Sequence, residues 1–182
     1  MIETREDCIA KTLPEVARLM ASAAISAPKS SGNDSILSWV LTGDDKHELA
    51  EHMRRIGEES GVPIFPRDAD NVDASECVVI IGVKCRPFGL DHCGLCGFEN
   101  CGALAKAGGR CVFNVTDLGI AVGSAVSVAA DHRVDNRVMY TVGRGAMEMD
   151  FMDPSVKICF GIPLSVTSKS IYYDRGPGSV LV

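Results

Sequence analysis

Cysteine side chains carry the most specific chemistry in this sequence. The chain has 182 residues and eight cysteines. Cys93, Cys96, Cys101 and Cys111 follow the spacing C-x2-C-x4-C-x9-C. Thiolates are the ligands of iron–sulfur clusters and of closed structural zinc sites. The spacing therefore predicts that these four residues hold one inorganic centre, and a [4Fe–4S] cluster is the centre that it favours.

Glycines are placed where a cluster needs them. Gly94, Gly97 and Gly102 each follow a cysteine directly. A residue without a Cβ adopts positive φ at low cost, which lets backbone N–H groups face the sulfur atoms of a cluster. Gly108 and Gly109 then return the chain toward Cys111. We expect a Cys-rich, cluster-binding insert over residues 84–112.

Two alternatives stay open for this segment. Four thiolates also make a structural zinc site, although such sites usually present two C-x2-C pairs and this chain has one. Cys85 lies in the same loop and could replace Cys111 as a ligand, act as a redox thiol, or be inert. His92 is expected to donate a hydrogen bond near the centre or to lie at the surface.

Bulk properties narrow the setting. The chain is 46% hydrophobic and 23% charged, with a formal net charge of -6 spread without long runs. This gives no electrostatic footprint for nucleic acid or for an anionic membrane. The start MIETREDCIA does not resemble a signal peptide, and the apolar stretch Leu118–Ala130 is short for a bilayer span. We expect a cytoplasmic protein and a single domain over residues 1–182.

The elements that must position the cysteines alternate between helices and strands. Apolar periodicity and capping residues predict long helices over 15–24, 44–60 and 114–132, and a short one from about residue 98. Short β-branched runs predict strands over 36–41, 77–83, 137–142 and 156–161. Small residues between Gly119 and Ala130 predict close packing, in the core or at a dimer interface. The order predicts an α+β fold with a mixed sheet flanked by helices.

Two resemblances concern the cysteines and the whole chain. The stretch CGLCGFENCGALAKAGG resembles the four-cysteine [4Fe–4S] module of electron-transfer subunits, although the last interval is shorter here. Through FENCG, NVTDLGIAVGSAVSVAADHRVDNRVMYTVG and GIPLSVTSKS-x-YYDR, the chain resembles the prokaryotic ferredoxin-domain-containing proteins of unknown function. The resemblance implies a cluster and brings no established reaction with it.

A third resemblance concerns the scaffold. The segment APKSSGN, followed by Trp39, is similar to the AP-S-x-x-N loop and QPW motif of the nitroreductase fold, and the tail from Phe160 to Arg175 is similar to its last strand and exit. This implies an α+β homodimer that binds FMN at the subunit interface. The implied flavin contacts are Ser30, Ser31 and Asn33, with Arg144 as a phosphate partner. The basic RRS-x-R opening of those enzymes is missing here.

Three functions follow from these observations. The first is an iron–sulfur redox protein that carries electrons or reduces an unknown small acceptor through a [4Fe–4S] cluster and FMN, which would make it an oxidoreductase. The second is a zinc-stapled, non-catalytic binding or regulatory protein. The third is a flavin enzyme whose cysteines are incidental. Chemical analysis for iron, sulfide, zinc and flavin separates them.

Overall fold

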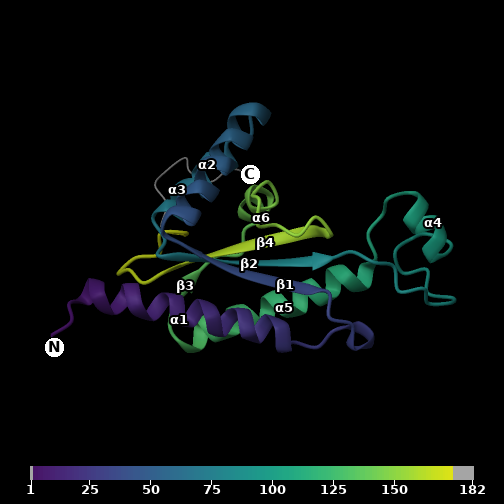
Figure 1. Cartoon of the computed structure of the whole chain (residues 1–182), viewed down its shortest axis with the longest axis horizontal. Helices are drawn as coiled ribbons and strands as arrows, with labels where there is room; N and C mark the ends of the chain where they lie inside the picture. Colours follow the sequence, from purple (N-terminus) through teal and green to yellow (C-terminus); the bar gives the residue numbers. More distant parts are fainter. Residues whose placement is uncertain (1, 174–182) are drawn as a thin grey trace.

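A four-stranded antiparallel sheet organises the chain. The computed structural model describes residues 2–173. The strands are β1 (Ile36–Thr42), β2 (Cys77–Lys84), β3 (Asp135–Asn136) and β4 (Val156–Ser165), in the order β1-β2-β4-β3 (Figure 1). Each of the three strand pairings in the described residues is antiparallel. The α+β prediction is confirmed, and the prediction of a mixed sheet is wrong.

The connection between β1 and β2 explains the antiparallel pairing. It contains two helices, α2 (Gly43–Ser60) and α3 (Ile64–Asp73). Arg54 of α2 pairs with Asp70 and Asp73 near the end of α3, and Lys46 near the start of α2 reaches the Asp73 carbonyl. The two helices therefore run antiparallel and bring the chain back to the end where β1 finished. A single helix would have crossed the sheet and favoured a parallel strand.

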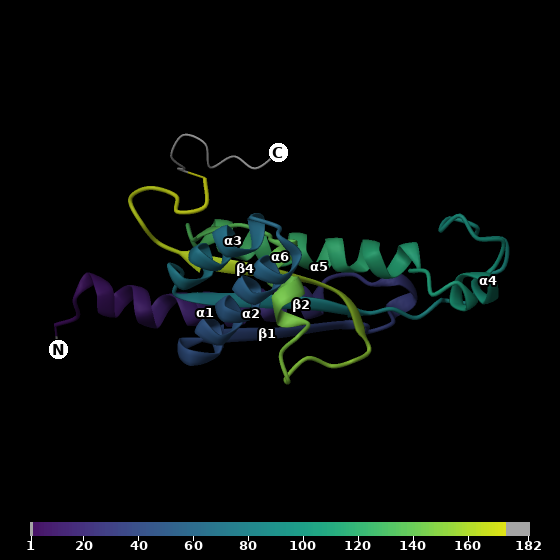
Figure 2. The same cartoon turned by 90° about the horizontal axis from the view of Figure 1, so that it is seen from above.

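The central strand β2 is buried on both faces, as its unbroken apolar sequence predicts. Val79 and Ile81 pack in the cluster that contains α1 and α5, whereas Val78 and Ile80 pack in the cluster that contains α2, α3 and α6. Successive side chains of a strand point to opposite faces, which produces this division. Figures 1 and 2 show the sheet between the two helical layers.

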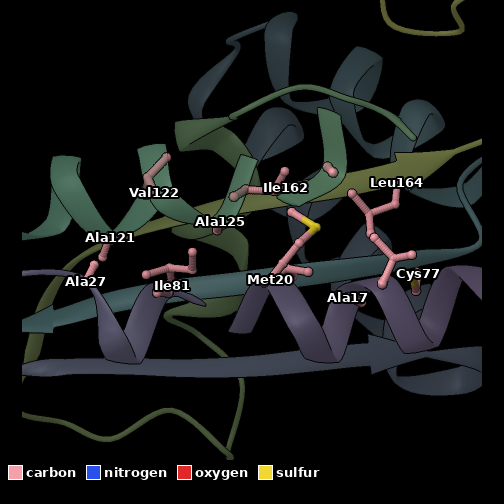
Figure 3. Packing of buried hydrophobic residues seen from close by; sticks show 14 of the residues in the cluster. Ala17, Met20, Ala27, Cys77, Ile81, Ala121, Val122, Ala125, Ile162 and Leu164 are labelled. Carbon is pink, nitrogen blue, oxygen red and sulfur yellow. The ribbon is translucent and has the colours of Figure 1, made fainter. Parts of the chain in front are cut away.

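One helical layer consists of α1 (Arg5–Ser26) and α5 (Val112–Asp131). Met20 of α1 and Ala125 of α5 meet Ile81 and Ile162 of the sheet in a close-packed core (Figure 3). The predicted start of the first helix, at residue 15, is wrong. A capping box between Thr4 and Asp7 starts α1 ten residues earlier and places Pro14 inside the helix.

The opposite layer consists of α2, α3 and α6 (Tyr140–Ala146). The predicted strand over 137–142 is wrong, because α6 begins at Tyr140 and Met139 forms only an isolated bridge with Gly161. A Cβ on Gly143 would lie 1.9 Å from the Cys159 carbonyl oxygen, so glycine lets this helix touch β4.

Helix α5 is long and apolar enough, by composition, to cross a membrane. It contacts α1 and the sheet, and Asn114 and Asp117 on its buried face are each only 1% exposed. A core helix passes the same test of length and composition, and the packing of α5 against α1 and the sheet is that of a core helix.

A small lobe extends from one end of the sheet. It comprises residues 85–111, includes the short helix α4 (Cys101–Lys106), and lies between the end of β2 and the start of α5. Figures 1 and 2 both show this segment projecting away from the helical layers. We call residues 85–111 the cysteine lobe.

Candidate metal centre

Four predicted ligands line one pocket of the cysteine lobe. Cys93, Cys96, Cys101 and Cys111 all contribute to its wall. Cys111 is 7% exposed, and the other three are partly buried. The structure therefore brings the four thiols to one place although they span nineteen positions of sequence.

Three of these cysteines lie in a tight turn or at the start of a helix. Cys96 lies in a turn closed by a 2.9 Å hydrogen bond from Gly97 N to the Gly94 carbonyl oxygen. Cys101 is the first residue of α4, whose N-cap side chain, Asn100, accepts a hydrogen bond from Ala103 N. Cys111 is the N-cap of the 20-residue helix α5. The positive end of a long helix stabilises a thiolate, which is the form that binds metals.

Glycine geometry shapes the lobe at two of the three positions that the sequence predicts, and the prediction for Gly102 is wrong because this residue lies inside α4. Gly94 and Gly97 have φ values of 59° and 81°, in the region that favours glycine. Gly109 is needed for a different reason. A Cβ there would lie 2.4 Å from Leu104 Cδ1 and 3.1 Å from Phe98 Cε2. The return from α4 toward Cys111 thus requires the absence of a side chain.

Apolar side chains surround the thiols. Phe88 and Phe113 stack edge to face, with ring centroids 5.7 Å apart, at the wall where the lobe meets α5. The remaining apolar lining residues are Leu90, Phe98, Leu104 and Val112. A water-poor surrounding of this kind controls solvent access to a cluster and helps to set its reduction potential.

The four cysteine residues share a pocket, but their side chains are not gathered around one point. Within residues 2–173, no three Cys, His, Asp or Glu side chains converge closely enough to hold one metal ion. Four thiolates are the donor set both of an iron–sulfur cluster and of a closed zinc site. The donor set therefore fits either centre.

The pocket is narrow for either centre. The free space between its walls is about 10 Å³, roughly that of one water molecule.

Cys85 lies apart from the four thiols. It is half-buried, packs against the core cluster of α1 and α5, and is not among the residues that line the pocket. Burial raises the pKa of the Cys85 thiol, which Arg110 opposes and Cys111 reinforces. A neutral thiol outside the pocket favours Cys111 over Cys85 as the fourth ligand.

Cations lie around the lobe, as expected for an anionic centre. Arg110 donates to the Gly108 carbonyl oxygen at 2.7 Å, which holds its side chain within the lobe. Lys84 lies 3.0 Å from Asp153, and hydrogen bonds from Ser155 together with Lys84 lower the pKa of the Asp153 carboxyl to about 2. His92 is exposed, with φ of 55°, and forms part of the loop surface.

The predicted flavin loop is anchored to α5. Ser30 to Gly32 form the short 3-10 turn η1. Ser30 donates from its backbone N (2.9 Å) and its hydroxyl (2.7 Å) to Asp117 Oδ1. Ser31 has a φ of 55° and is exposed, as is Asn33.

Arg144 lies on the other side of the sheet. It belongs to α6, is exposed, and is 3.9 Å from Glu148. It lines a pocket with Tyr140 and Phe160, whereas Asn33 lines a different pocket with Lys84 and Arg86. The three loop residues and Arg144 therefore belong to opposite layers of one chain. Arg175, the end of the nitroreductase-like tail, lies outside the described residues.

Sequence reasoning missed two contributions to the site. It did not assign Asp117 to the site, but Asp117 holds the Ser30 loop. It also did not identify Phe88 and Phe113, because apolar residues that flank a ligand do not stand out from core residues. The signal available for Asp117 was a carboxylate on the apolar face of a predicted buried helix.

Solved structures with a similar fold include nitroreductases and an oxidoreductase that contains FMN. Nitroreductase CinD from Lactococcus lactis, in complex with nicotinic acid, matches all of this chain and 86% of its own with a TM-score of 0.58 and 12% identity. An oxidoreductase containing FMN matches 85% of this chain and 67% of its own, with a TM-score of 0.58 and 13% identity. At these identities the likeness shows the fold: it is nitroreductase-like.

The chain is shorter than some of these proteins. Nitroreductase A from Vibrio parahaemolyticus matches 86% of this chain with a TM-score of 0.55 and 11% identity, but the chain spans 60% of that protein's length. Activities of the longer enzymes therefore do not transfer with the fold.

Sequence comparisons place the chain in a family. Residues 107–175 match the family described as uncharacterized protein containing a ferredoxin domain (DUF2148). An uncharacterized protein from Archaeoglobus fulgidus is 39% identical over 170 residues, which cover 88% of this chain and 90% of the relative. Because the 39% identity extends over nearly the whole chain, this chain with its nitroreductase-like fold belongs to the ferredoxin-domain-containing DUF2148 family.

Proposed function

We propose that this chain is an iron–sulfur redox protein that binds one [4Fe–4S] cluster through Cys93, Cys96, Cys101 and Cys111. The observation that carries the proposal is that all four thiols line one pocket enclosed by apolar side chains. The family's ferredoxin domain and the oxidoreductase fold support a redox role. Such a cluster supplies one-electron transfer when it is bound.

The residues around the pocket have separable tasks in this proposal. The four thiolates hold the cluster, and the N-terminus of α5 at Cys111 directs the positive end of a helix dipole toward this anionic centre. Phe88 and Phe113 exclude water from one wall. Arg110, held by loop carbonyls, offsets negative charge. We place this activity in the cytoplasm, where reducing conditions keep such thiols available as ligands.

We further propose that the protein is a homodimer and that a flavin would bind only between two protomers. Ser30, Ser31 and Asn33 lie with the α1 and α5 layer, whereas Arg144 lies on α6 across the sheet. A second protomer is the simplest way to bring both groups to one ligand. The missing basic opening weakens the phosphate site, so FMN binding is secondary to the cluster in this proposal.

One set of measurements tests the proposed function. Iron, acid-labile sulfide, zinc and flavin are quantified on anaerobically purified protein, and visible spectra are recorded before and after dithionite. We expect about four iron and four sulfide per chain, with absorption that bleaches on reduction. One zinc per chain without sulfide would instead establish the zinc-stapled alternative.

Variants assign the ligands. Replacing Cys93, Cys96, Cys101 or Cys111 singly by alanine is expected to abolish or strongly reduce the iron content. Cys8→Ala is the matched control, because Cys8 is exposed on α1 and remote from the lobe. Cys85→Ala should retain iron, and loss of iron in that variant with retention in Cys111→Ala would reverse the assignment of the fourth ligand.

A further inference from the structure

A polar cavity lies at the base of the cysteine lobe. It is lined by Asn33, Asp34, Ser35, Lys84 and Arg86, and its volume is about 130 Å³. Ser35 precedes β1 and Lys84 ends β2, and Lys84 N donates to the Ser35 carbonyl oxygen at 2.9 Å. The cavity is therefore built on the end of the sheet, beside the segment that leads into the lobe.

One of the two cationic side chains at this cavity forms no ion pair with the described residues and is free to bind an anion. Lys84 and Arg86 face a single acidic lining residue, Asp34. The Lys84 ammonium lies 3.0 Å from Asp153, so its charge is largely balanced. No ion pair to the Arg86 guanidinium occurs in the part of the chain that the structure describes, and this side chain is exposed. A guanidinium matches the planar oxygen pair of a phosphate or carboxylate.

Ser35, one of the residues that line this cavity, carries a buried hydroxyl without a partner in the described part of the chain. Ser35 is only 6% exposed, and across residues 2–173 its Oγ atom has no hydrogen-bond partner. A buried hydroxyl without a partner is unfavourable, so an observed one calls for a group that is not part of the chain.

Asn114 supplies a second unpaired donor next to Arg86. It is 1% exposed, and its Oδ1 accepts a hydrogen bond from Arg86 N at 2.9 Å. Its Nδ2 has no partner among the described residues. Asn114 thereby fixes the backbone position of Arg86, a residue that lines the cavity. It acts as a positioning residue.

We propose that this cavity binds the oxyanion group, phosphate or carboxylate, of a small molecule. The Arg86 guanidinium supplies the charge, and the Ser35 hydroxyl donates a hydrogen bond to the same group. Arg86 is two residues from Phe88, which lines the cysteine pocket, so a bound molecule lies beside that pocket. The binding of an oxyanion at this cavity does not depend on the proposed function. Only a role of the bound molecule as electron acceptor would rest on the proposed function.

Calorimetric titration of the purified full-length protein tests this proposal. Inorganic phosphate and acetate are titrated separately at constant ionic strength set by sodium chloride. We expect saturable binding of at least one of them, which also distinguishes the two oxyanion classes. Arg86→Gln should lower the affinity by about tenfold or more, because it removes a charged hydrogen bond.

Two further variants separate binding from folding. Ser35→Ala should weaken anion binding several-fold while leaving the urea midpoint unchanged or higher, since it removes an unpaired buried hydroxyl. Arg18→Gln is the matched control, because it removes the same charge from an exposed position on α1. Its affinity should equal that of the unaltered protein.

The outcomes are decisive. The proposal is overturned if neither anion binds saturably, if Arg18→Gln weakens binding as much as Arg86→Gln, or if Ser35→Ala leaves binding unchanged. Iron and sulfide are measured on the same samples. Anion binding by a protein without iron would refute the proposed function and support oxyanion binding at this cavity. A protein that contains iron and sulfide but binds neither anion would support the proposed function and refute oxyanion binding.

Discussion

Two buried thiols make the stability of this protein sensitive to alkaline pH. Cys77 is fully buried in β2, and Cys159 is 5% exposed in β4. Burial raises the pKa of each thiol from 9.0 to about 12. An unfolded chain loses these protons near pH 9, whereas the folded chain keeps them to about pH 12. The stabilisation is therefore complete below pH 9 and is lost between pH 9 and pH 12.

Urea unfolding at several pH values checks this expectation. Above pH 9, the free energy of unfolding should fall by about 1.4 kcal/mol per pH unit for each buried thiol. Cys77→Ala should have a shallower slope than the unaltered protein. Cys8→Ala, which alters an exposed thiol, should keep the original slope. Equal slopes in both variants would show that Cys77 is not a source of the dependence.

A second prediction at the residue scale concerns Gly109. Gly109→Ala places a Cβ against Leu104 and Phe98, so we expect the lobe to lose iron while the urea midpoint of the sheet domain changes little. Gly102→Ala is the control within the lobe, because its Cβ would meet only the Asn100 side chain at 3.2 Å. Iron content per chain is the measurement, and retention of iron by Gly109→Ala would contradict the packing argument.

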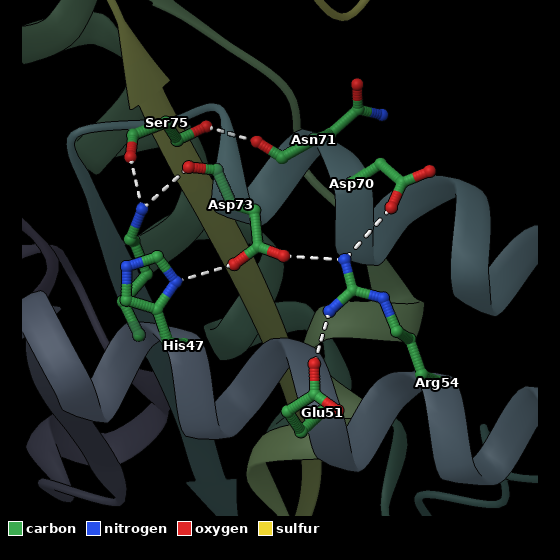
Figure 4. A network of polar contacts seen from close by, with 8 residues as sticks. His47, Glu51, Arg54, Asp70, Asn71, Asp73 and Ser75 are labelled. Carbon is green, nitrogen blue, oxygen red and sulfur yellow. Dashed lines mark hydrogen bonds and ion pairs between the residues drawn. The ribbon is translucent and has the colours of Figure 1, made fainter.

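At the scale of elements, α2 and α3 are joined by buried and partly buried polar contacts (Figure 4). Lys46, 5% exposed, donates to the carbonyl oxygens of Asp73 (2.9 Å) and Ser75 (2.7 Å) just after α3. Arg54 binds Glu51, Asp70 and Asp73. The Lys46 contacts satisfy carbonyl groups that a helix end leaves without partners, whereas the Arg54 contacts are ion pairs with carboxylates.

Removal of the Lys46 ammonium should therefore destabilise this helix pair. Lys46→Met keeps most of the side-chain volume but leaves two carbonyl groups unpaired, and we expect a loss of about 2 kcal/mol in the free energy of unfolding. Lys106→Met, at an exposed position in α4, is the control with no expected change. A change below about 0.5 kcal/mol for Lys46→Met would show that water replaces its contacts.

Some elements could be predicted from sequence because their signals are local. β1 and β2 match the expected strands at their starts, and Gly61 ends α2 in the left-handed conformation. Other elements depended on contacts that no local pattern reveals. The end of the helix predicted over 44–60 is confirmed, but no pattern predicted α3, which has Pro63 as its N-cap and Pro66 in its first turn. The anchoring of Ser30 by Asp117 links positions 87 residues apart.

At the scale of the whole molecule, the outer face of α5 is open. Gly119, Ile120, Gly123 and Ser127 are exposed, and a Cβ on Gly119 or Gly123 would meet nothing within 4 Å. Small residues allow two helices to approach closely, so this face suits the homodimer that we propose.

Sedimentation of a variant at this face tests the dimer. Gly123→Leu should shift the protein toward monomer at micromolar concentration without altering its circular dichroism, because the added side chain has room in one chain. Glu58→Leu adds the same side chain at an exposed position of α2 and should leave the association unchanged. A monomeric unaltered protein, or a dimeric Gly123→Leu variant, would exclude this face as the interface.

The hydrogen bond between Arg86 N and Asn114 Oδ1 closes the neck of the cysteine lobe at the point where the chain leaves and re-enters the body. No residue between these two contributes a strand to the sheet. The pairing of the strands therefore does not depend on the length of the cysteine lobe. A short linker in place of the cysteine lobe would leave the same core without the four clustered cysteines. The lobe could in turn be grafted onto another protein in which the end of a strand and the start of a helix lie as close together as those of β2 and α5.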